Sequence, residues 1–117
     1  MDKNATILII DDDEISLLIL QNAFEMEGYH VVTTTDSLNA EALFNEHSPH
    51  AIVLDVFMPD RDGFEIVRAI RKECSTSLIV AISSNDGYLP TIKALGANLA
   101  LNKSMLPHDI VAAVQAL

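Results

Sequence analysis

IVLDVFMPDRDG, residues 52–63, contains the change of pattern that decides the fold. A short apolar run of strand character leads directly into Asp55. Two more apolar residues follow, and an acid-rich turn then closes at Gly63, where a helical apolar pattern begins. The stretch therefore predicts a buried strand, a polar loop and a helix, with a carboxylate at the end of the strand.

The same alternation extends over the whole chain of 117 residues, which is the length of one domain. Short β-branched or apolar runs alternate with helical patterns, an order that indicates βαβ units and a parallel sheet. The runs ILII and LIVAI are apolar at every position, as expected for strands covered on both faces. We predict one doubly wound α/β domain, residues 1–117, with five strands and five helices. The expected strands are Thr6–Ile10, His30–Thr34, Ala51–Leu54, Leu78–Ile82 and Asn98–Leu101, and the expected helices are Ile15–Glu27, Ser37–Glu46, Gly63–Cys74, Pro90–Leu95 and Pro107–Leu117.

The composition limits the possible partners. Seventeen acidic and seven basic residues give a formal net charge of −10, which disfavours nucleic acid and anionic membranes as main partners. The N-terminal apolar run is too short for a signal peptide, and no apolar stretch approaches membrane-spanning length. The single cysteine, Cys74, allows no intramolecular disulfide, which favours the cytoplasm, and we interpret it as a structural thiol.

Polar residues follow the predicted strands at the carboxyl edge of the sheet, where doubly wound folds have their functional crevice. Two carboxylates about 5 Å apart repel by roughly 3 kcal/mol at an effective dielectric constant of 20, so a cluster of them needs a proton or a cation. Carboxylates together with phosphate oxygens are the usual environment of Mg²⁺. A carboxylate beside such a metal can act as a nucleophile and form an aspartyl phosphate, and Asp55 is placed to do so. The residues concerned are Asp11, Asp12, Asp55, Ser83 and Lys103.

Asp13 and Glu14 have two interpretations. They can belong to this acidic cluster, or they can form the first turn of the next helix, where the helix dipole stabilises negative charge.

The sequence resembles the response regulator receiver family over essentially its whole length. The resemblance rests on ILIIDDDE, VLDVFMPDRDG, LIVAISS and GANLALNK in this order, and the second of these motifs is highly specific. It implies a flavodoxin-like (βα)5 fold with strand order 2-1-3-4-5 and a function in two-component phosphorelay signalling. The implied partners are a sensor histidine kinase or a histidine phosphotransfer protein, with a possible downstream protein target. No output domain is visible.

The resemblance also implies roles for individual residues. Asp55 is the expected phosphoacceptor, and Ser83 and Lys103 are expected to contact the phosphoryl oxygens. The domain would assist its own phosphorylation and dephosphorylation without being an enzyme in the strict sense. We expect the side chains of Phe57 and Met58 in the core. The expected Mg²⁺ ligands are Asp11, Asp12, Asp55 and the backbone carbonyl of Phe57.

Two departures from the family pattern lead to predictions. Ser104 replaces the usual proline after Lys103, and because a non-proline cis peptide costs about 2.5–4 kcal/mol we predict a trans bond. Ala100 replaces the frequent aromatic residue near the end of strand five and has no ring that could rotate. We therefore predict that activation changes residues 84–89, which contain Tyr88, more than strand five. The alternative is a phosphate relay without a large switch.

The first helix has more apolar residues than one buried stripe requires. We predict that Ile15, with Leu18 or Ile19, is exposed beside the crevice, where a partner helix could bind. The alternative is that neighbouring elements cover all three side chains.

Three other functions fit parts of the sequence. A haloacid-dehalogenase-like phosphatase would use Asp11 of the Asp-x-Asp stretch as its nucleophile, but no acidic pair follows Lys103 and the Asp55 motif would be unexplained. A flavin-binding domain would place a phosphate at a strand-one loop with four acids and no glycine, which is electrostatically unfavourable. A degenerate receiver that acts as a docking module is disfavoured because all the chemical residues are present.

Overall fold

The computed structural model describes residues 1–2 and 4–117, and its centre is a parallel sheet of five strands. The strand order is β2-β1-β3-β4-β5, as predicted. All neighbouring strands pair in parallel. The strands are β1 (Thr6–Ile10), β2 (His30–Thr34), β3 (Ala51–Asp55), β4 (Leu78–Ser83) and β5 (Leu99–Asn102).

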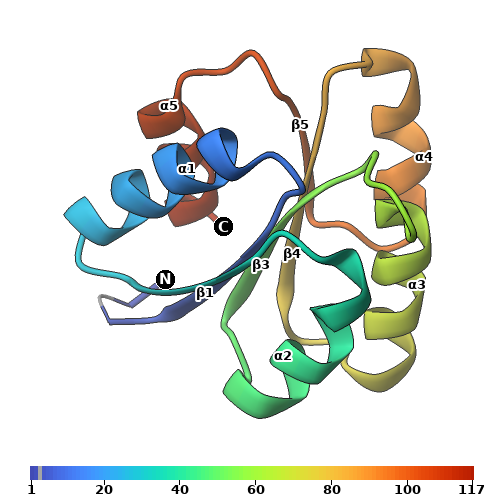
Figure 1. Ribbon diagram of the computed structural model, residues 1–117, viewed down its shortest axis with the longest axis horizontal. Helices are drawn as coiled ribbons and strands as arrows, with labels where there is room; N and C mark the ends of the chain where they lie inside the picture. The colour runs from blue at the N-terminus through green and yellow to red at the C-terminus, as the bar shows by residue number, and fades with distance from the viewer. Residues whose placement is uncertain (3) are drawn as a thin grey trace.

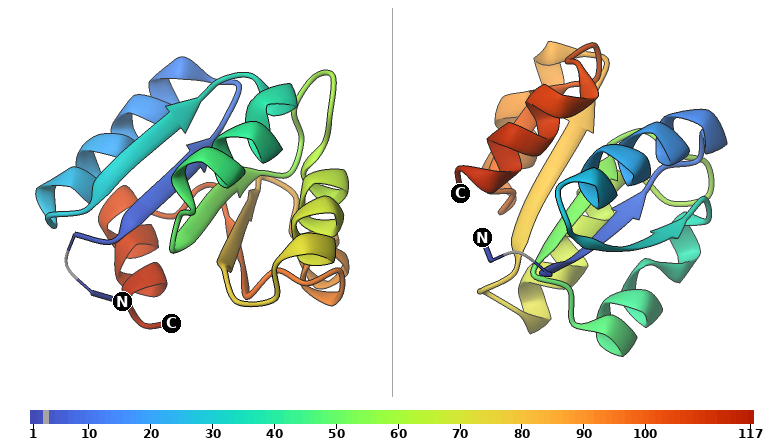
Figure 2. Two further views of the ribbon diagram at one scale, coloured as in Figure 1. Left: turned by 90° about the horizontal axis from the view of Figure 1, so that it is seen from below. Right: turned by 90° about the vertical axis from the view of Figure 1, so that its left-hand side faces the viewer.

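Helices cover both faces of this sheet. α1 and α5 lie on one face, and α2, α3 and α4 lie on the other (Figures 1 and 2). None of the helices in the described ranges is both long and apolar enough to cross a membrane. The α-helices are α1 (Glu14–Met26), α2 (Ala40–His47), α3 (Gly63–Glu73), α4 (Leu89–Ala94) and α5 (Pro107–Gln115), and short 3-10 turns, η1 (Ser37–Asn39) and η2 (Asp86–Tyr88), precede α2 and α4.

The two covered faces explain why the central strands are apolar at every position. Side chains alternate between the faces of a strand, so each strand supplies both cores. In β1, Ile7 and Ile9 pack in the core under α1 and α5, whereas Leu8 and Ile10 pack in the core under α2, α3 and α4. All five residues of β3 are buried.

Several predicted boundaries need correction. The second helix begins as a 3-10 turn because the Asp36 side chain accepts the backbone N–H of Leu38 at 2.9 Å. The fourth helix is Leu89–Ala94, and η2 in front of it was not predicted. The expected first, third and fifth helices end one or two residues too late, and the first begins one residue earlier than expected. β5 lies one residue further along the chain, and β3 and β4 each extend by one residue, because backbone pairing continues to Asp55 and Ser83.

Gly63 sets the course of the chain between β3 and α3. A Cβ atom at this position would lie 2.7 Å from Val56 Cα and 2.8 Å from Leu54 Cδ1, so a side chain does not fit. The N–H of Gly63 donates to the carbonyl of Val56, and the Asp62 side chain accepts the N–H of Glu65 at 3.0 Å as the cap of α3. The loop therefore folds back over the end of β3, where it surrounds Asp55.

Candidate functional site

The predicted acidic residues converge at the carboxyl edge of the sheet. β1 and β3 are neighbours, with Ile10 opposite Leu54, so Asp11 and Asp55 at their ends come together. These two side chains are buried, with 4% and 8% exposure, whereas Asp12 is exposed. One carboxylate oxygen from each of the three aspartates lies within 4.8 Å of the others. The sequence prediction of a carboxylate cluster is thus confirmed.

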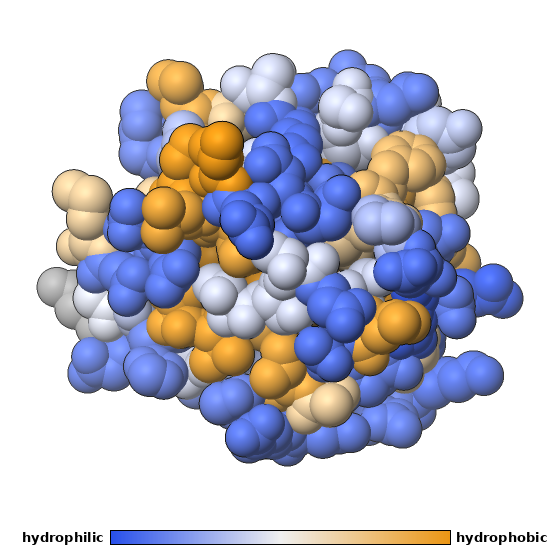
Figure 3. All heavy atoms as spheres, viewed as in Figure 1, coloured by the Kyte–Doolittle hydropathy of each residue, from blue (hydrophilic) through white to orange (hydrophobic). Residues whose placement is uncertain are grey.

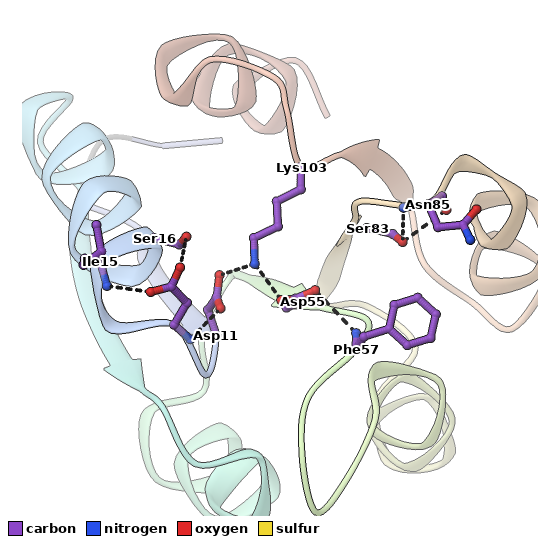
Figure 4. Close-up of polar contacts among 9 residues, drawn as sticks. Asp11, Ile15, Ser16, Asp55, Phe57, Ser83, Asn85 and Lys103 are labelled. Carbon is purple, nitrogen blue, oxygen red and sulfur yellow. Dashed lines mark hydrogen bonds and ion pairs between the residues drawn. The ribbon is translucent and has the colours of Figure 1, made fainter.

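Lys103 reaches this cluster from the end of β5, across the end of β4 (Figure 4). Its Nζ lies 2.7 Å from Asp55 Oδ2 and 3.3 Å from Asp11 Oδ2. Burial by itself would lower the pKa of Lys103, but the hydrogen bond and the charge of Asp55, together with the charge of Asp11, raise it. The ammonium group therefore stays charged and compensates part of the negative charge.

Asp11 is held from two sides. Burial raises the pKa of its carboxyl group. The N–H of Asp13, which donates to Asp11 Oδ1 at 3.0 Å, and the charge of Lys103 oppose this rise, while the charge of Asp55 adds to it. A buried carboxylate with a raised pKa next to two others favours the approach of a cation.

Asp13 is a helix cap. Its carboxylate accepts the hydroxyl of Ser16 at 2.8 Å and the N–H of Ile15 at 3.1 Å, and these bonds hold the pKa of Asp13 below its usual value. Glu14 is the first residue of α1. For both acids the helix-terminus interpretation describes the structure.

Phe57 differs from the prediction. Its N–H donates to Asp55 Oδ1 at 3.4 Å, but the residue is 45% exposed and belongs to neither core, so the expected core position of its side chain is wrong. The ring lies instead against the rings of Phe64 and Tyr88, edge-to-face. Met58 is half-buried and packs against the core beneath α2, α3 and α4.

Ser83 lies at the end of β4 beside the carboxylate cluster, but its hydroxyl is bonded to Asn85. It is fully buried, and it lies next to Ile82, which pairs with Asp55. Its hydroxyl accepts the N–H of Asn85 at 3.0 Å and donates to the carbonyl of Asn85 at 3.1 Å (Figure 4). Within the described residues no hydrogen bond joins Ser83 to Asp55, so its contact with a phosphoryl group stays a prediction.

The backbone after Lys103 follows the prediction. The described residues contain no cis peptide bond, so the Lys103–Ser104 bond is trans. The Asn102 side chain accepts the N–H of Ser104 at 2.8 Å and donates to Asp86 at 2.6 Å. Asn102 thus joins the loops that follow β4 and β5, a role that the sequence analysis did not identify.

An aromatic cluster of Phe57, Phe64 and Tyr88 stands beside the carboxylates. The centroids of the Phe57 and Tyr88 rings are 4.9 Å apart, and Phe64 lies 5.9 Å from Tyr88 and 6.2 Å from Phe57, all in edge-to-face geometry. The three residues come from separate segments, so no periodicity in the sequence relates them. The sequence offered only one indication that they meet, which is that they follow strands three and four and so lie at the carboxyl edge of the sheet.

The exposed apolar surface predicted on α1 is present. Ile15, Leu18 and Ile19 are 71%, 56% and 48% exposed, and Figure 3 shows apolar side chains gathered over this helix. Ile19 also lines a pocket of about 220 Å³ between α1 and the chain that leads into α5. Asp11 and Lys103 line the same pocket, so the apolar surface adjoins the carboxylate cluster.

Comparisons with known proteins agree with this geometry. The family model described as response regulator receiver domain matches residues 7–115. The transcriptional regulatory protein PrrA of Mycobacterium bovis is 34% identical over 100% of this chain and 52% of its own length. The alkaline phosphatase synthesis transcriptional regulatory protein PhoP of Bacillus subtilis is 31% identical over 97% of this chain and 48% of its own length. The chain thus spans about half the length of these curated relatives. The solved structure of the chemotaxis response regulator CheY4 of Vibrio cholerae is 27% identical, with a TM-score of 0.89 over 96% of this chain and 97% of that one.

Proposed function

The chain belongs to the response regulator receiver family, which acts in two-component signal transduction, and on this premise we propose that Asp55 is the residue that carries the phosphoryl group. The observation that supports this most is the 2.7 Å contact between Lys103 Nζ and Asp55 Oδ2 inside the carboxylate cluster. The other oxygen, Oδ1, is held only by the 3.4 Å contact from Phe57 among the described residues. It is therefore the less constrained oxygen and the better nucleophile.

The transfer is a displacement at phosphorus. An oxygen of Asp55 forms a bond to the phosphorus atom while the bond from phosphorus to a histidine nitrogen of the donor breaks. That nitrogen keeps the electron pair. Lys103 pairs with the phosphoryl oxygens, as it now pairs with Asp55 Oδ2. The hydroxyl of Ser83 can donate to another phosphoryl oxygen after it leaves Asn85. In this reading the domain is a signalling domain that assists its own phosphorylation and dephosphorylation.

We further propose Mg²⁺ as the cofactor, with Asp11, Asp12, Asp55 and the Phe57 carbonyl as ligands. The fit rests on the donor set, because hard divalent cations prefer oxygen ligands and the three carboxylates lie within 4.8 Å of one another. Lys103 compensates one of the three negative charges, so two remain for a divalent ion. When bound, such an ion neutralises charge on the transferred phosphoryl group.

The donor is proposed to be a sensor histidine kinase or a histidine phosphotransfer protein that docks on the exposed side chains of α1. This surface adjoins the carboxylate cluster, so a partner bound there would have its phosphohistidine close to Asp55. α1 and α5 contain no lysine or arginine, so we expect basic residues around the apolar contact of the partner. A downstream protein target, a cytoplasmic location and a single receiver domain over residues 1–117 complete the proposal.

Phosphorylation by acetyl phosphate tests the chemistry without a kinase. The protein should gain one phosphoryl group in the presence of Mg²⁺ and none with EDTA. Mass spectrometry of peptides after borohydride reduction should locate the group at Asp55, and Asp55→Asn should remain unlabelled. A phosphoryl group on Asp11, or full labelling of Asp55→Asn, would contradict the proposal and favour the phosphatase interpretation.

A further inference from the structure

The single proton of the Ser83 hydroxyl links the carboxylate site to the loop between β4 and α4. Oγ of Ser83 donates this proton to the carbonyl oxygen of Asn85 at 3.1 Å. A hydroxyl group has one proton to donate, so a full hydrogen bond to a phosphoryl oxygen and one to Asn85 exclude each other. If Ser83 turns toward a phosphoryl group on Asp55, the carbonyl of Asn85 loses its buried partner.

The same carbonyl oxygen also holds Tyr88. The N–H of Tyr88 donates to the carbonyl of Asn85 at 3.3 Å, and the Asn85 side chain accepts the N–H of Gly87 at 2.9 Å. These bonds form the short turn η2, in which Gly87 permits a wide range of backbone angles. A change at the carbonyl of Asn85 therefore acts directly on the backbone of Tyr88.

A second connection runs from Asp55 to the Tyr88 ring. The N–H of Phe57 donates to Asp55 Oδ1, and the Phe57 ring meets the Tyr88 ring edge-to-face at 4.9 Å. Phe64 completes the cluster at 5.9 Å from Tyr88. Phosphorylation of Asp55 changes the carboxylate that accepts the N–H of Phe57. It also draws the hydroxyl proton of Ser83 away from the carbonyl of Asn85, to which the turn is bonded. Both connections end at Tyr88.

We propose that Tyr88 is the residue that reports the state of Asp55 on the protein surface. In the unphosphorylated domain Ser83 holds Asn85, and Tyr88 packs against Phe57 and Phe64. When Ser83 donates to a phosphoryl oxygen, η2 loosens and the Tyr88 ring leaves the aromatic cluster, which exposes Phe57 and Phe64 to a downstream target. This inference rests on the proposed phosphorylation of Asp55.

The surroundings favour movement of this turn over movement of β5. Tyr88 is 42% exposed and lies in a turn of three residues. Ala100, in contrast, is paired with Ala81 within the sheet, packs against the core beneath α2, α3 and α4, and carries a single methyl group. An exposed ring on a short turn reorients at lower cost than a strand that is hydrogen-bonded to its neighbour.

Fluorine NMR tests the inference in the intact chain. The protein has two tyrosines, and labelling with 3-fluorotyrosine gives two resonances, which Tyr88→Phe assigns. Tyr29 is buried against Phe24 and serves as the internal reference. Beryllofluoride with Mg²⁺ mimics the phosphoryl group, and its bound fluorides appear in the same spectrum. We expect the Tyr88 resonance to shift by more than its line width and the Tyr29 resonance to stay in place.

Ser83→Ala and Ser84→Ala form a matched pair for the hydroxyl link, because Ser84 is the exposed neighbour of Ser83. We expect Ser83→Ala to move the Tyr88 resonance before beryllofluoride is added, whereas Ser84→Ala retains the wild-type spectrum and response. Bound fluoride with an unmoved Tyr88 resonance would overturn this inference and leave the phosphorylation of Asp55 standing. Absence of bound fluoride would overturn both. A wild-type Tyr88 spectrum and response in Ser83→Ala would refute the link through Asn85.

Discussion

Replacement of Lys103 by methionine tests how the buried carboxylates are stabilised. At an effective dielectric constant of 20, the contacts of 2.7 and 3.3 Å from Nζ to Asp55 and Asp11 correspond to attractions of about 6 and 5 kcal/mol. Carboxylate oxygens of the cluster lie within 4.8 Å of one another, so two of them repel by at least about 3.5 kcal/mol. Without the lysine this repulsion is uncompensated, whereas the desolvation cost of the ammonium group disappears.

The expected change in the free energy of unfolding is smaller than these Coulomb energies. Removal of one partner from a buried ion pair costs about 3–5 kcal/mol, but the Lys103 side chain is 30% exposed and water can reach the site. We therefore expect Lys103→Met to lower the free energy of unfolding by about 2–3 kcal/mol. For a domain of this size the unfolding midpoint should fall by roughly 10 °C.

Thermal unfolding followed by circular dichroism in EDTA measures this change. Lys93→Met is the control, since Lys93 is exposed on α4 and its removal should cost at most about 1 kcal/mol. The double variant Lys103→Met with Asp55→Asn should regain more than half of the loss, because the repulsion with Asp11 is removed. Mg²⁺ should raise the midpoint of Lys103→Met more than that of the wild type. An unchanged midpoint in EDTA, or no recovery in the double variant, would refute this account of the site.

Three further predictions concern other parts of the chain. Gly63→Ala should lower the free energy of unfolding by about 2–3 kcal/mol in denaturant titrations, because the new Cβ would lie 2.7 Å from the Val56 backbone. Gly87→Ala should cost less than half as much, because its Cβ would meet only the Asn85 side chain. Equal losses in the two variants would contradict the steric argument. Hydrogen bonds with Ser77 and, to a smaller extent, with Thr76 lower the pKa of the Cys74 thiol to about 6. The rate of its alkylation by iodoacetamide should therefore rise with a midpoint near pH 6, and this midpoint should move to higher pH in Ser77→Ala. A midpoint of the wild type near the ordinary thiol pKa of about 8.5 would exclude these bonds. Leu18→Ser should slow phosphorylation by a cognate phosphohistidine donor at least tenfold and leave the rate with acetyl phosphate within twofold, because Leu18 is exposed on the docking surface proposed for α1. Equal slowing with both donors would argue against docking on this helix.

The local pattern of the sequence was sufficient for the sheet and placed most element boundaries to within one or two residues. β1 and β2 begin and end at the predicted residues, since apolar and β-branched runs mark them clearly. The pattern was less informative where a polar residue continues a strand. Asp55 pairs with Ile82 and Ser83 pairs with Asn102, because backbone hydrogen bonding does not depend on the polarity of the side chain. The 3-10 turn at Asp86–Tyr88 was missed because a local side-chain cap from Asn85, rather than an apolar period, produces it.

The sequence by itself determined which groups arrive at the carboxyl edge. Asp11 and Lys103 directly follow β1 and β5, and Asp55 is the last residue of β3. Parallel strands end at the same edge of the sheet whatever the details of their packing. Only the tertiary structure decided what each group touches. The contact from Lys103 to Asp55 joins residues 48 positions apart, the Ser83 hydroxyl faces Asn85, and the Phe57 ring points out of the core toward Tyr88. A hydrogen bond or a ring contact depends on atoms placed to within a few tenths of an ångström by separate segments, and a pattern along the chain carries no information at that scale.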